Sequence, residues 1–389
     1  MSIDPGRAPP AEIGTLVVGG GILGMCVAGF LAAEGRDVAV IDDGGIGGTI
    51  ANAGSLHVQM QSRFMRLYPH LVAGVEASLP LYKRAVAFWH EFTAALGADV
   101  DLKMTGGLMV AESREQLDFL AEKVRREVAL GLRSEILERD ALHRIAPYLG
   151  PAVVGAELCY EEGKLNPLLA NAAIRAWATG SGVVLVEGVA VDRLTRVASG
   201  FRAETARGTV TAGRVVLAAG SGTRRLAACL GVNVPAEPEP LHMNITEAAA
   251  PLIGHLVQHA DRPITLKQLG TGQIVIGGGW PAHVGGPRRH PTVEAASLVG
   301  NATLAQHIVP RIGRARIIRT WAGLNTTVDG KGVLGPVPAV PGLFVAVPGD
   351  AGYTLGPLSA RLVADTVLDR PPEIDLAPYS PARFGPLEA

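Results

Sequence analysis

The chain has 389 residues, more than a single hydrophobic core normally organises, so we expect two closely joined domains. Its formal net charge of −1 and its isoelectric point near 6.8 argue against a protein that binds nucleic acid through charge. A hydrophobic content of 48% together with 49 glycines is typical of a tightly packed α/β protein with many turns.

The N-terminal part of the chain contains one well-defined motif. Residues 1–12 are polar and proline-rich, which predicts disorder, and residues 15–42 then follow the order strand, glycine turn, helix, strand, acid. Gly19 permits the tight turn, Gly21 lets a pyrophosphate approach the backbone, and Gly24 brings the helix against the sheet. Asp42 is placed to accept hydrogen bonds from a ribose diol. The alternative, a membrane anchor over residues 15–33, fits less well because glycines cluster at one end and an acidic strand follows at once.

The segment after Asp42 carries the next group of candidate residues. It is rich in glycine over residues 44–54, so its bare backbone can wrap the rest of a dinucleotide. Polar and apolar residues then alternate over 56–63, which predicts an extended segment with one polar face. That face carries His57, Gln59, Gln61 and Arg63. It either lines a cavity and binds substrate, or is a solvated strand face, and the sequence leaves both interpretations open.

The remaining pattern predicts a discontinuous architecture. The expected helices are 75–97, 113–130, a helix ending at 179, 293–309 and one after Pro357; the expected strands are 106–111, 183–187, 190–196, 210–214, 241–246, 264–269, 273–277 and 343–347. Short strands dominate from 235 to 319, which predicts an antiparallel sheet in a second domain. The three cysteines, Cys26, Cys159 and Cys229, are far apart and lack metal-ligand spacing, so we predict no metal site and a reducing, cytoplasmic location.

Several separated motifs resemble the D-amino acid oxidase-like flavoproteins, which include glycine oxidase, sarcosine oxidase and D-amino acid dehydrogenase. They follow the family's order over nearly the whole chain: GGGILG (19–24), GGTIANAGSL (47–56), EEGKLNP (161–167), VVLAAGSGTRRL (215–226), TWAGLNTTVDGKGVLGPVP (320–338) and GLFVAVPGDAGYTLGP (342–357). The resemblance implies an α/β fold with a Rossmann-like FAD-binding domain of the glutathione reductase type, from 13–85, 147–235 and 320–386. A second, α+β substrate-binding domain built on an antiparallel sheet would come from 86–146 and 236–319.

The resemblance also implies FAD as the cofactor. The glycine turn at Gly19, Gly21 and Gly24 would hold the pyrophosphate, Asp42 the ribose and Val189 the adenine. The N-terminus of the last helix would lie near the flavin, where its positive dipole end stabilises a reduced anionic flavin. The further cofactor contacts that it implies are Ile22, Leu23, Asp43, Gly48, Thr49, Asn52, Ala53, Gly54, Ser55, Leu56, Ala219, Gly220, Gly323, Gly349, Asp350, Ala351, Gly352, Tyr353 and Thr354.

Two departures from the family pattern bear on the substrate and the electron acceptor. Glycine oxidase-like members carry an arginine that clamps the substrate carboxylate, and here Asn325 stands in that place. Either another cation takes over, Arg63 first and Arg319 second, or the substrate is not a simple amino acid. Sarcosine oxidase-like members carry a lysine that helps the flavin react with oxygen. Val275 or Ile276 aligns there, which favours a dehydrogenase over a self-sufficient oxidase.

The implied activity is oxidation of an amine next to a carboxylate, with hydride transfer from the α-carbon to flavin N5. His57 is a candidate for substrate contact or amine deprotonation, and equally for a structural histidine. Gln59 and Tyr353 could contact the substrate. The run HVQMQSRFMRLYP at 57–69 most resembles flavin (beta) subunits of hetero-oligomeric hydroxyproline, proline or opine dehydrogenases.

That resemblance implies alpha subunits, and small ferredoxin-like subunits, that carry further redox centres. Any membrane association would then arise through a partner. The alternatives are an oxygen-dependent amine oxidase that produces hydrogen peroxide and a non-catalytic flavin relay subunit.

Overall fold

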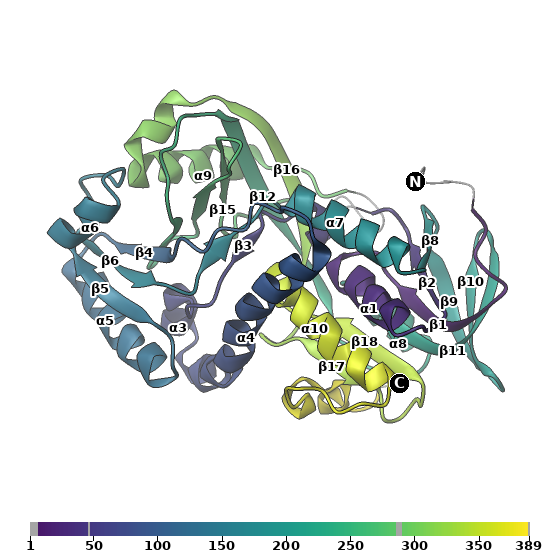
Figure 1. Ribbon diagram of the computed structural model, residues 1–389. Coiled ribbons are helices and arrows are strands. Elements are labelled where there is room, and N and C mark those ends of the chain that lie inside the picture. The colour runs from purple at the N-terminus through teal and green to yellow at the C-terminus, as the bar shows by residue number, and fades with distance from the viewer. Residues whose placement is uncertain (1–6, 46, 285–289, 388–389) are drawn as a thin grey trace.

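The computed structural model describes residues 7–45, 47–284 and 290–387, and its strands form two large sheets that lie side by side (Figure 1). The chain starts in one half of the molecule and twice crosses to the other and returns, so its first strand and last helix share a half. Residues 1–6 of the predicted disordered segment 1–12 lie outside the described residues. In the rest of that segment, the Ala11 carbonyl accepts a hydrogen bond from Thr211, and Glu12 begins the first strand.

The first sheet has a parallel core. Its strands run in the order β17 (Val333–Pro336), β18 (Leu343–Val347), β11 (Gly208–Leu217), β1 (Glu12–Val18), β2 (Val38–Asp42) and β8 (Val184–Glu187). All neighbours pair in parallel except β17, which lies antiparallel at the edge. Leu16 lies opposite Ala39 on one side and Val215 on the other. These strands are near-continuous apolar runs because both faces of the sheet are covered.

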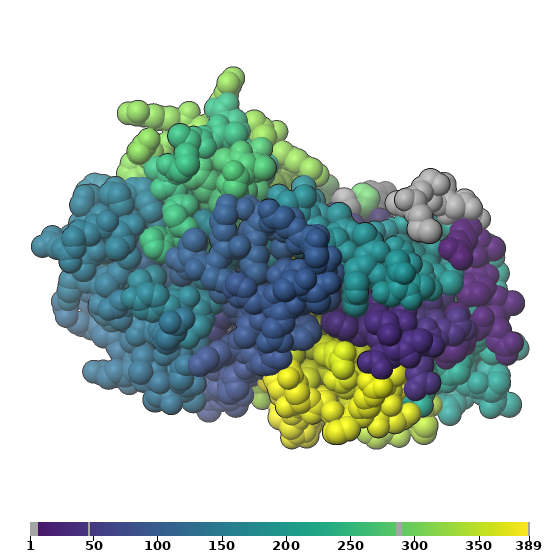
Figure 2. Space-filling view, viewed as in Figure 1, coloured from purple at the N-terminus to yellow at the C-terminus, as the bar shows by residue number. Residues whose placement is uncertain are grey.

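Helices cover one face of this sheet and a small antiparallel extension covers the other. The helical side holds α1 (Ile22–Ala33), α4 (Val72–Leu96), α7 (Pro167–Gly180) and α10 (Gly352–Val367). In the space-filling view α4 occupies the middle of this side (Figure 2). The opposite side holds β9 (Val191–Val197), β10 (Gly200–Thr205) and α8 (Gly222–Ala228). A Cβ on Gly29 would overlap the Trp177 ring, so α1 and α7 pack closely only because residue 29 is glycine.

The second sheet is almost entirely antiparallel, as predicted. Its strands run in the order β16 (Ile317–Thr327), β12 (Glu237–Ala248), β15 (Gln273–Gly277), β14 (Thr265–Gln268), β13 (Leu256–His259), β4 (Gly107–Ala111), β6 (Gly155–Cys159) and β5 (Ser134–Glu138). Only β13 and β4 pair in parallel. Strand β6 falls within the range 147–235 assigned from sequence to the first domain, and β16 crosses the predicted boundary at residue 319.

The remaining elements are short or peripheral. They are α2 (Gly48–Ala51), β3 (Ser55–Leu56), α3 (Ser62–Leu67), α5 (Arg114–Ala129), α6 (Arg139–Ile145), β7 (Gly163–Lys164), α9 (Ala295–Ile308) and four 3-10 segments (Pro69–Leu71, Pro310–Arg314, Ala377–Tyr379 and Pro381–Phe384). Strands β3 and β7 form a two-stranded ladder of their own. Among the helices that the structure describes, none is both long and apolar enough to cross a bilayer.

Two predictions about local structure are wrong. The last helix begins at Gly352 rather than after Pro357. Pro357 cannot donate to the Tyr353 carbonyl one turn earlier, and the Trp89 indole N–H fills that place at 3.1 Å. The extended segment ends at Gln61 because α3 starts at Ser62, so Arg63 does not share a face with His57. Strand β10 was not predicted at all.

A fully buried ionic triad joins α5 to the second sheet. The Lys123 Nζ lies 2.8 Å from Glu127 Oε1 and 2.6 Å from Glu157 Oε2, and all three side chains are inaccessible to solvent. The Glu127 carboxylate also accepts the Met60 N–H at 2.6 Å. Burial, opposed by the Lys123 charge, raises the pKa of Glu157 well above its ordinary value. The Lys123 ammonium group therefore holds both carboxyl groups, and one of them, on Glu127, anchors the segment around Met60.

We predict that Lys123→Met destabilises the fold by about 3–5 kcal/mol, because two buried carboxyl groups lose their counter-charge. Arg125→Gln is the control, because its ion pair with Glu122 is exposed and is worth less than about 1 kcal/mol. Urea unfolding of both variants measures the difference. Equal midpoints for the two variants would contradict the assigned role of the triad.

Candidate active site

The turn between β1 and α1 requires glycine at two positions. Gly19 has a φ of +109°, and a Cβ there would overlap the Ala218 carbonyl oxygen. A Cβ on Gly24 would overlap the Gly19 carbonyl oxygen, so α1 approaches the turn as closely as a bare backbone allows. At Gly21 the nearest atom to a Cβ would be Thr49 Oγ1 at 3.0 Å. This is the geometry of a turn that presents a helix N-terminus to a phosphate group.

Two polar side chains fix the surroundings of this turn. Asp42 ends β2, and its carboxylate accepts the N–H groups of Gly20 at 2.6 Å and Gly44 at 2.8 Å. Burial raises the pKa of Asp42, and the two N–H groups oppose that shift. Thr49 Oγ1 accepts the Ile22 N–H at 2.9 Å, which holds α2 against the start of α1. The Asp42 carboxylate therefore lies beside the glycine turn, as a ribose-binding acid must.

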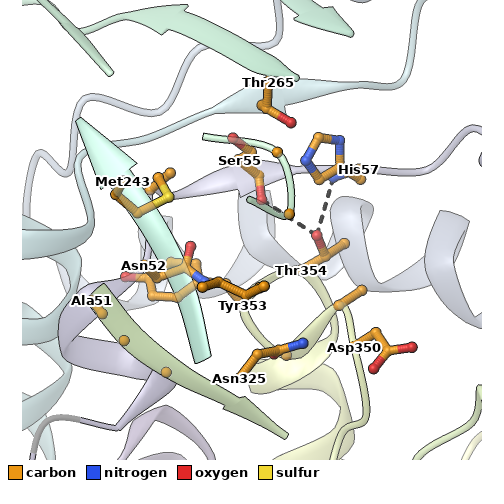
Figure 3. A pocket seen from close by; sticks show the side chains of 18 residues that line it. Ala51, Asn52, Ser55, His57, Met243, Thr265, Asn325, Asp350, Tyr353 and Thr354 are labelled. Atoms are coloured by element: carbon orange, nitrogen blue, oxygen red, sulfur yellow. Dashed lines mark hydrogen bonds between the residues drawn. The ribbon is translucent and has the colours of Figure 1, made fainter. Parts of the chain in front are cut away.

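A cavity of about 260 Å³ opens between the two sheets next to this turn (Figure 3). Its walls come from the α2–β3 region, from β12, β14 and β16, from the loop after β15 and from the N-terminus of α10. The lining residues are Gly48, Ala51, Asn52, Ala53, Ser55, His57, Leu241, Met243, Thr265, Gly278, Gly279, Gly323, Asn325, Asp350, Ala351, Gly352, Tyr353 and Thr354. The Trp321 indole donates to the Ala51 carbonyl at 2.9 Å and so joins β16 to α2 across the cavity.

The cavity brings together many of the residues selected from sequence. Those that line it are Gly48, Asn52, Ala53, Ser55, His57, Gly323, Asp350, Ala351, Gly352, Tyr353 and Thr354. The rest of the predicted cofactor set lies outside the lining: Gly19, Gly21, Ile22, Leu23, Gly24, Asp42, Asp43, Thr49, Gly54, Leu56, Val189, Ala219, Gly220 and Gly349. Val189 donates its N–H to the Asp42 carbonyl at 3.1 Å, so it lies at the predicted adenosine end.

The five predicted catalytic residues divide into two groups. His57 and Tyr353 line the cavity. Gln59 is buried behind it, and Arg63 and Arg319 are exposed and outside the lining. Their placement therefore offers no support for the predicted carboxylate clamp. The Tyr353 hydroxyl donates to Asn171 Oδ1 at 3.0 Å, and its ring stacks on Trp89 at 5.5 Å, so this tyrosine builds the wall of the cavity.

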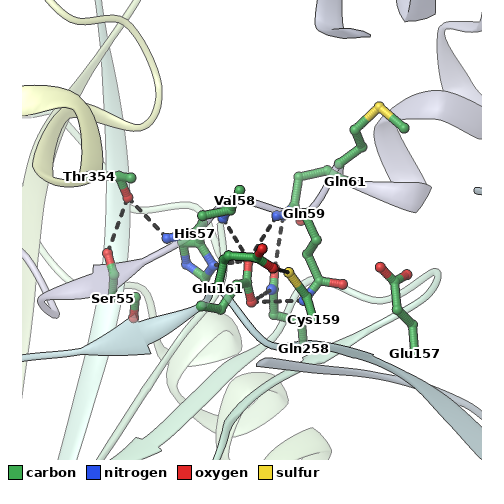
Figure 4. Close-up of polar contacts among 12 residues, drawn as sticks. Ser55, His57, Val58, Gln59, Gln61, Glu157, Cys159, Glu161, Gln258 and Thr354 are labelled. Carbon is green, nitrogen blue, oxygen red and sulfur yellow. Dashed lines mark hydrogen bonds and ion pairs between the residues drawn. The ribbon is translucent and has the colours of Figure 1, made fainter. Parts of the chain in front are cut away.

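His57 is held from both sides. Its backbone N–H donates to Thr354 Oγ1 at 3.0 Å, and its ring Nδ1 lies 3.7 Å from Glu162 Oε1 (Figures 3 and 4). The side chain of His57 is 26% exposed, whereas that of Glu162 is fully buried. Burial alone would raise the pKa of Glu162, but the His57 ring and the N–H groups of Gln59 and Val58 lower it. The ring thus lies between the cavity and an ionised carboxylate.

Sequence reasoning missed several wall residues and Glu162. Leu241, Met243 and Thr265 occupy alternate positions on strands that were predicted, but nothing in the sequence indicated which face those strands present. Glu162 belongs to the EEGKLNP motif, yet only the fold brings it beside His57. Among the described residues, no group of His, Cys, Asp and Glu side chains is arranged to hold a metal ion.

A phosphate-type glycine turn with a ribose-type acid, joined to a second sheet across a shared cavity, defines the class of two-domain, dinucleotide-dependent oxidoreductases. The comparison with known families is specific: the chain belongs to the DAO family of FAD dependent oxidoreductases, whose model matches residues 15–366. It is therefore a FAD-dependent oxidoreductase.

Relatives match along nearly the whole chain. Glycine oxidase of Geobacillus kaustophilus is 28% identical over 372 residues, covering 94% of this chain and 96% of that protein. An opine oxidase subunit of Rhizobium meliloti is 28% identical over 397 residues, covering 97% and 99%. The crystal structure of the Geobacillus kaustophilus glycine oxidase superposes with a TM-score of 0.86 at 26% identity, covering 96% of this chain and 99% of that one.

The residues present fit FAD. The cavity wall includes the bare backbone of Gly278, Gly279 and Gly323, and a Cβ on Gly279 would point into open space. The buried Ser55 hydroxyl, which also lines the cavity, has no hydrogen-bond partner among the described residues. Glycine walls leave room for a flat ring system, and an unpaired buried hydroxyl requires a ligand or water as its partner.

We predict that Asp42→Asn weakens FAD binding by about 10- to 100-fold, because a charge-assisted hydrogen bond to the ribose is worth roughly 1.5–3 kcal/mol. Asp43→Asn is the matched control, because that carboxylate lies at the surface and accepts the Gly45 N–H at 2.8 Å. Titration of apoprotein with FAD, followed by flavin fluorescence, measures both dissociation constants. An equal loss of affinity in the two variants would exclude the ribose role of Asp42.

Proposed function

We propose that this chain is the catalytic flavin subunit of a dehydrogenase that oxidises an amino or imino acid to its imine. The substrate classes are D-hydroxyproline, proline, sarcosine and opine-like compounds. The observation that carries the proposal is the cavity, where the N-terminus of α10, the unpaired Ser55 hydroxyl and the His57 ring meet. A non-catalytic relay subunit would need no such polar cavity. Two relatives named for glycine and opine oxidation support the same chemistry.

The chain's own residues bind, orient and deprotonate the substrate. FAD, when bound, supplies the acceptor for the hydride equivalent from the substrate α-carbon. Because His57 Nδ1 faces Glu162, its Nε2 is the ring atom left to take a proton from the substrate ammonium group. The Glu162 carboxylate then stabilises the imidazolium. Leu241 and Met243 exclude water from the cavity and hold the apolar part of the substrate.

A partner subunit is part of this proposal. The opine oxidase relative is named as one subunit of an enzyme, and the likeness extends over 97% of this chain. An iron–sulfur cluster requires four cysteine ligands as a rule, and this chain contains three cysteines, of which Cys26 and Cys159 are buried. We therefore assign the onward electron carriers to alpha and ferredoxin-like partner subunits.

A second candidate function is an oxygen-dependent oxidase, and one observation favours it. Val275 or Ile276 aligns with the lysine that helps sarcosine oxidase-like enzymes react with oxygen. Lys267 on β14 lies directly opposite Val275 on β15, so a lysine side chain extends from the same face of the sheet one strand away. The choice between oxygen and a partner subunit as acceptor is therefore a matter for experiment.

Anaerobic mixing of the purified FAD-loaded chain with each substrate class tests the proposal. We expect one class to bleach the flavin absorbance at about 450 nm, and His57→Gln to slow that bleaching roughly 100-fold, the size of a general-base effect. Admission of air then separates oxidase from dehydrogenase.

Arg63→Gln is the control for His57→Gln. Because the Arg63 side chain is exposed on α3 and outside the cavity lining, we expect the KM of Arg63→Gln to stay within about twofold of the wild-type value. If FAD is bound and no class bleaches it, the catalytic assignment of the isolated chain is wrong.

A further inference from the structure

Two buried lysines beside the cavity have no acidic partner. The Lys267 side chain is fully buried, and its Nζ donates only to the Leu165 carbonyl at 3.1 Å. The Lys164 Nζ donates to the carbonyls of Ile253 at 3.3 Å and Gly254 at 2.8 Å. Within the described part of the chain, neither amine lies within ion-pair distance of a carboxylate. Lys123 is also fully buried, but it pairs with two carboxyl groups.

Both lysines come from strands that carry or pair with residues of the cavity wall. Lys267 follows the lining residue Thr265 by two positions on β14, so the two side chains point to the same face of the sheet. The Leu165 carbonyl that Lys267 binds would lie 2.6 Å from a Cβ on Gly54. Ser55, the next residue, lines the cavity and pairs with Lys164 in the β3–β7 ladder. The carbonyl that Lys267 binds and the strand that carries Lys164 therefore both adjoin the segment 54–55 at the cavity wall.

The charge state of the two amines depends on their surroundings. Burial, reinforced by the charge of Lys164, lowers the pKa of Lys267 well below its ordinary value. Burial and the charge of Lys103 lower the pKa of Lys164 to about 8. Asp101 opposes both shifts, but its carboxylate is already paired with Lys103 at 2.6 Å. The remaining titratable group beside Lys164 is the half-buried His255. A negative charge in the cavity would supply the counter-charge that both amines lack.

We propose that Lys267 and Lys164 form the counter-charge for an anion in the cavity, and that Lys267 takes up a proton from solvent as the anion arrives. This inference rests on the proposed function. The described lining includes no lysine or arginine, so no cationic side chain of the lining neutralises an anion there directly. The same chemistry suits two sources of negative charge, the substrate carboxylate and reduced FAD, and the experiment has one arm for each.

The experiment compares Lys267→Met with the wild-type chain, both loaded with FAD. Pyrrole-2-carboxylate is the carboxylate probe, and sulfite, which combines with oxidised FAD and leaves it negatively charged, is the flavin probe. Flavin absorbance gives both dissociation constants. We expect Lys267→Met to weaken at least one probe by about tenfold, the effect of losing one nearby opposite charge. Lys83→Met, which removes an exposed lysine on α4 outside the cavity lining, should change neither by more than about twofold.

Proton uptake gives an independent measurement. Because the anion favours protonated Lys267, binding to the wild-type chain should take up about one proton, and affinity should fall as pH rises, by at most about tenfold per pH unit. Calorimetric titration in two buffers with different ionisation enthalpies measures this proton count. In Lys267→Met the uptake should disappear, whereas a purely structural lysine would leave the proton count unchanged.

The stability of the variant distinguishes this role from a structural one. Methionine has a similar length and removes an unpaired buried amine, so the melting temperature of Lys267→Met should be equal to or higher than that of the wild-type chain. If Lys267→Met fails to bind FAD, Lys164→Met takes its place in both arms.

Each outcome of the two arms is decisive. Weakening of the carboxylate probe alone assigns the anion to the substrate, weakening of sulfite alone assigns it to reduced FAD, and weakening of both assigns both. Unchanged affinity for both probes overturns the inference. Neither probe requires turnover, so this result is separate from a failure of every amino acid to reduce the flavin.

Discussion

One buried carboxylate ties the two halves of the molecule together at the cavity. Glu162 accepts the backbone N–H groups of Val58 and Gln59, the Gln59 side-chain amide and the amide of Gln258 on β13. Residues 58 and 59 lie in the segment directly after β3, whereas β13 belongs to the second sheet. Burial raises the pKa of this carboxyl group, but the His57 ring and the N–H groups of Gln59 and Val58 lower it below its ordinary value, which favours the ionised form. The position of His57, and hence of the cavity wall, depends on this interaction.

The buried lysines differ in whether a carboxylate pairs with them, and this difference separates a structural lysine from the two that we propose act in binding. Lys123 is neutralised by two carboxyl groups, so it joins elements and needs nothing from outside the fold. Among the described residues, the amines of Lys267 and Lys164 donate hydrogen bonds to carbonyl oxygens and pair with no carboxylate, an arrangement that destabilises the folded chain unless a negative charge comes near. Such local destabilisation is common at binding sites, where a ligand completes the interactions that the fold leaves open.

The sequence predicted those parts of the site that are local in the chain. Gly19, Gly24 and Asp42 lie in one continuous βαβ unit, so spacing alone indicated their roles, and the antiparallel second sheet followed from its short strands. The start of α10 could not be predicted because an indole from α4, distant in sequence, replaces the hydrogen bond that Pro357 cannot make. The sequence also could not predict that Lys267 lacks an acidic partner among the described residues, because the positions of acids around a lysine depend on the fold.

The nature of the counter-charge has a consequence for substrate selection. An arginine at the cavity would grip a carboxylate through a planar fork and so fix its orientation. Asn325 stands at that place and donates instead to Glu239 at 3.0 Å. The amines of Lys267 and Lys164 do not line the cavity, so they attract negative charge without fixing its direction. The orientation of the substrate must then come from the shape of the cavity walls and from His57. A site of this kind tolerates bulk on the amine nitrogen better than a forked clamp does, which favours secondary amines such as imino acids and opines over glycine.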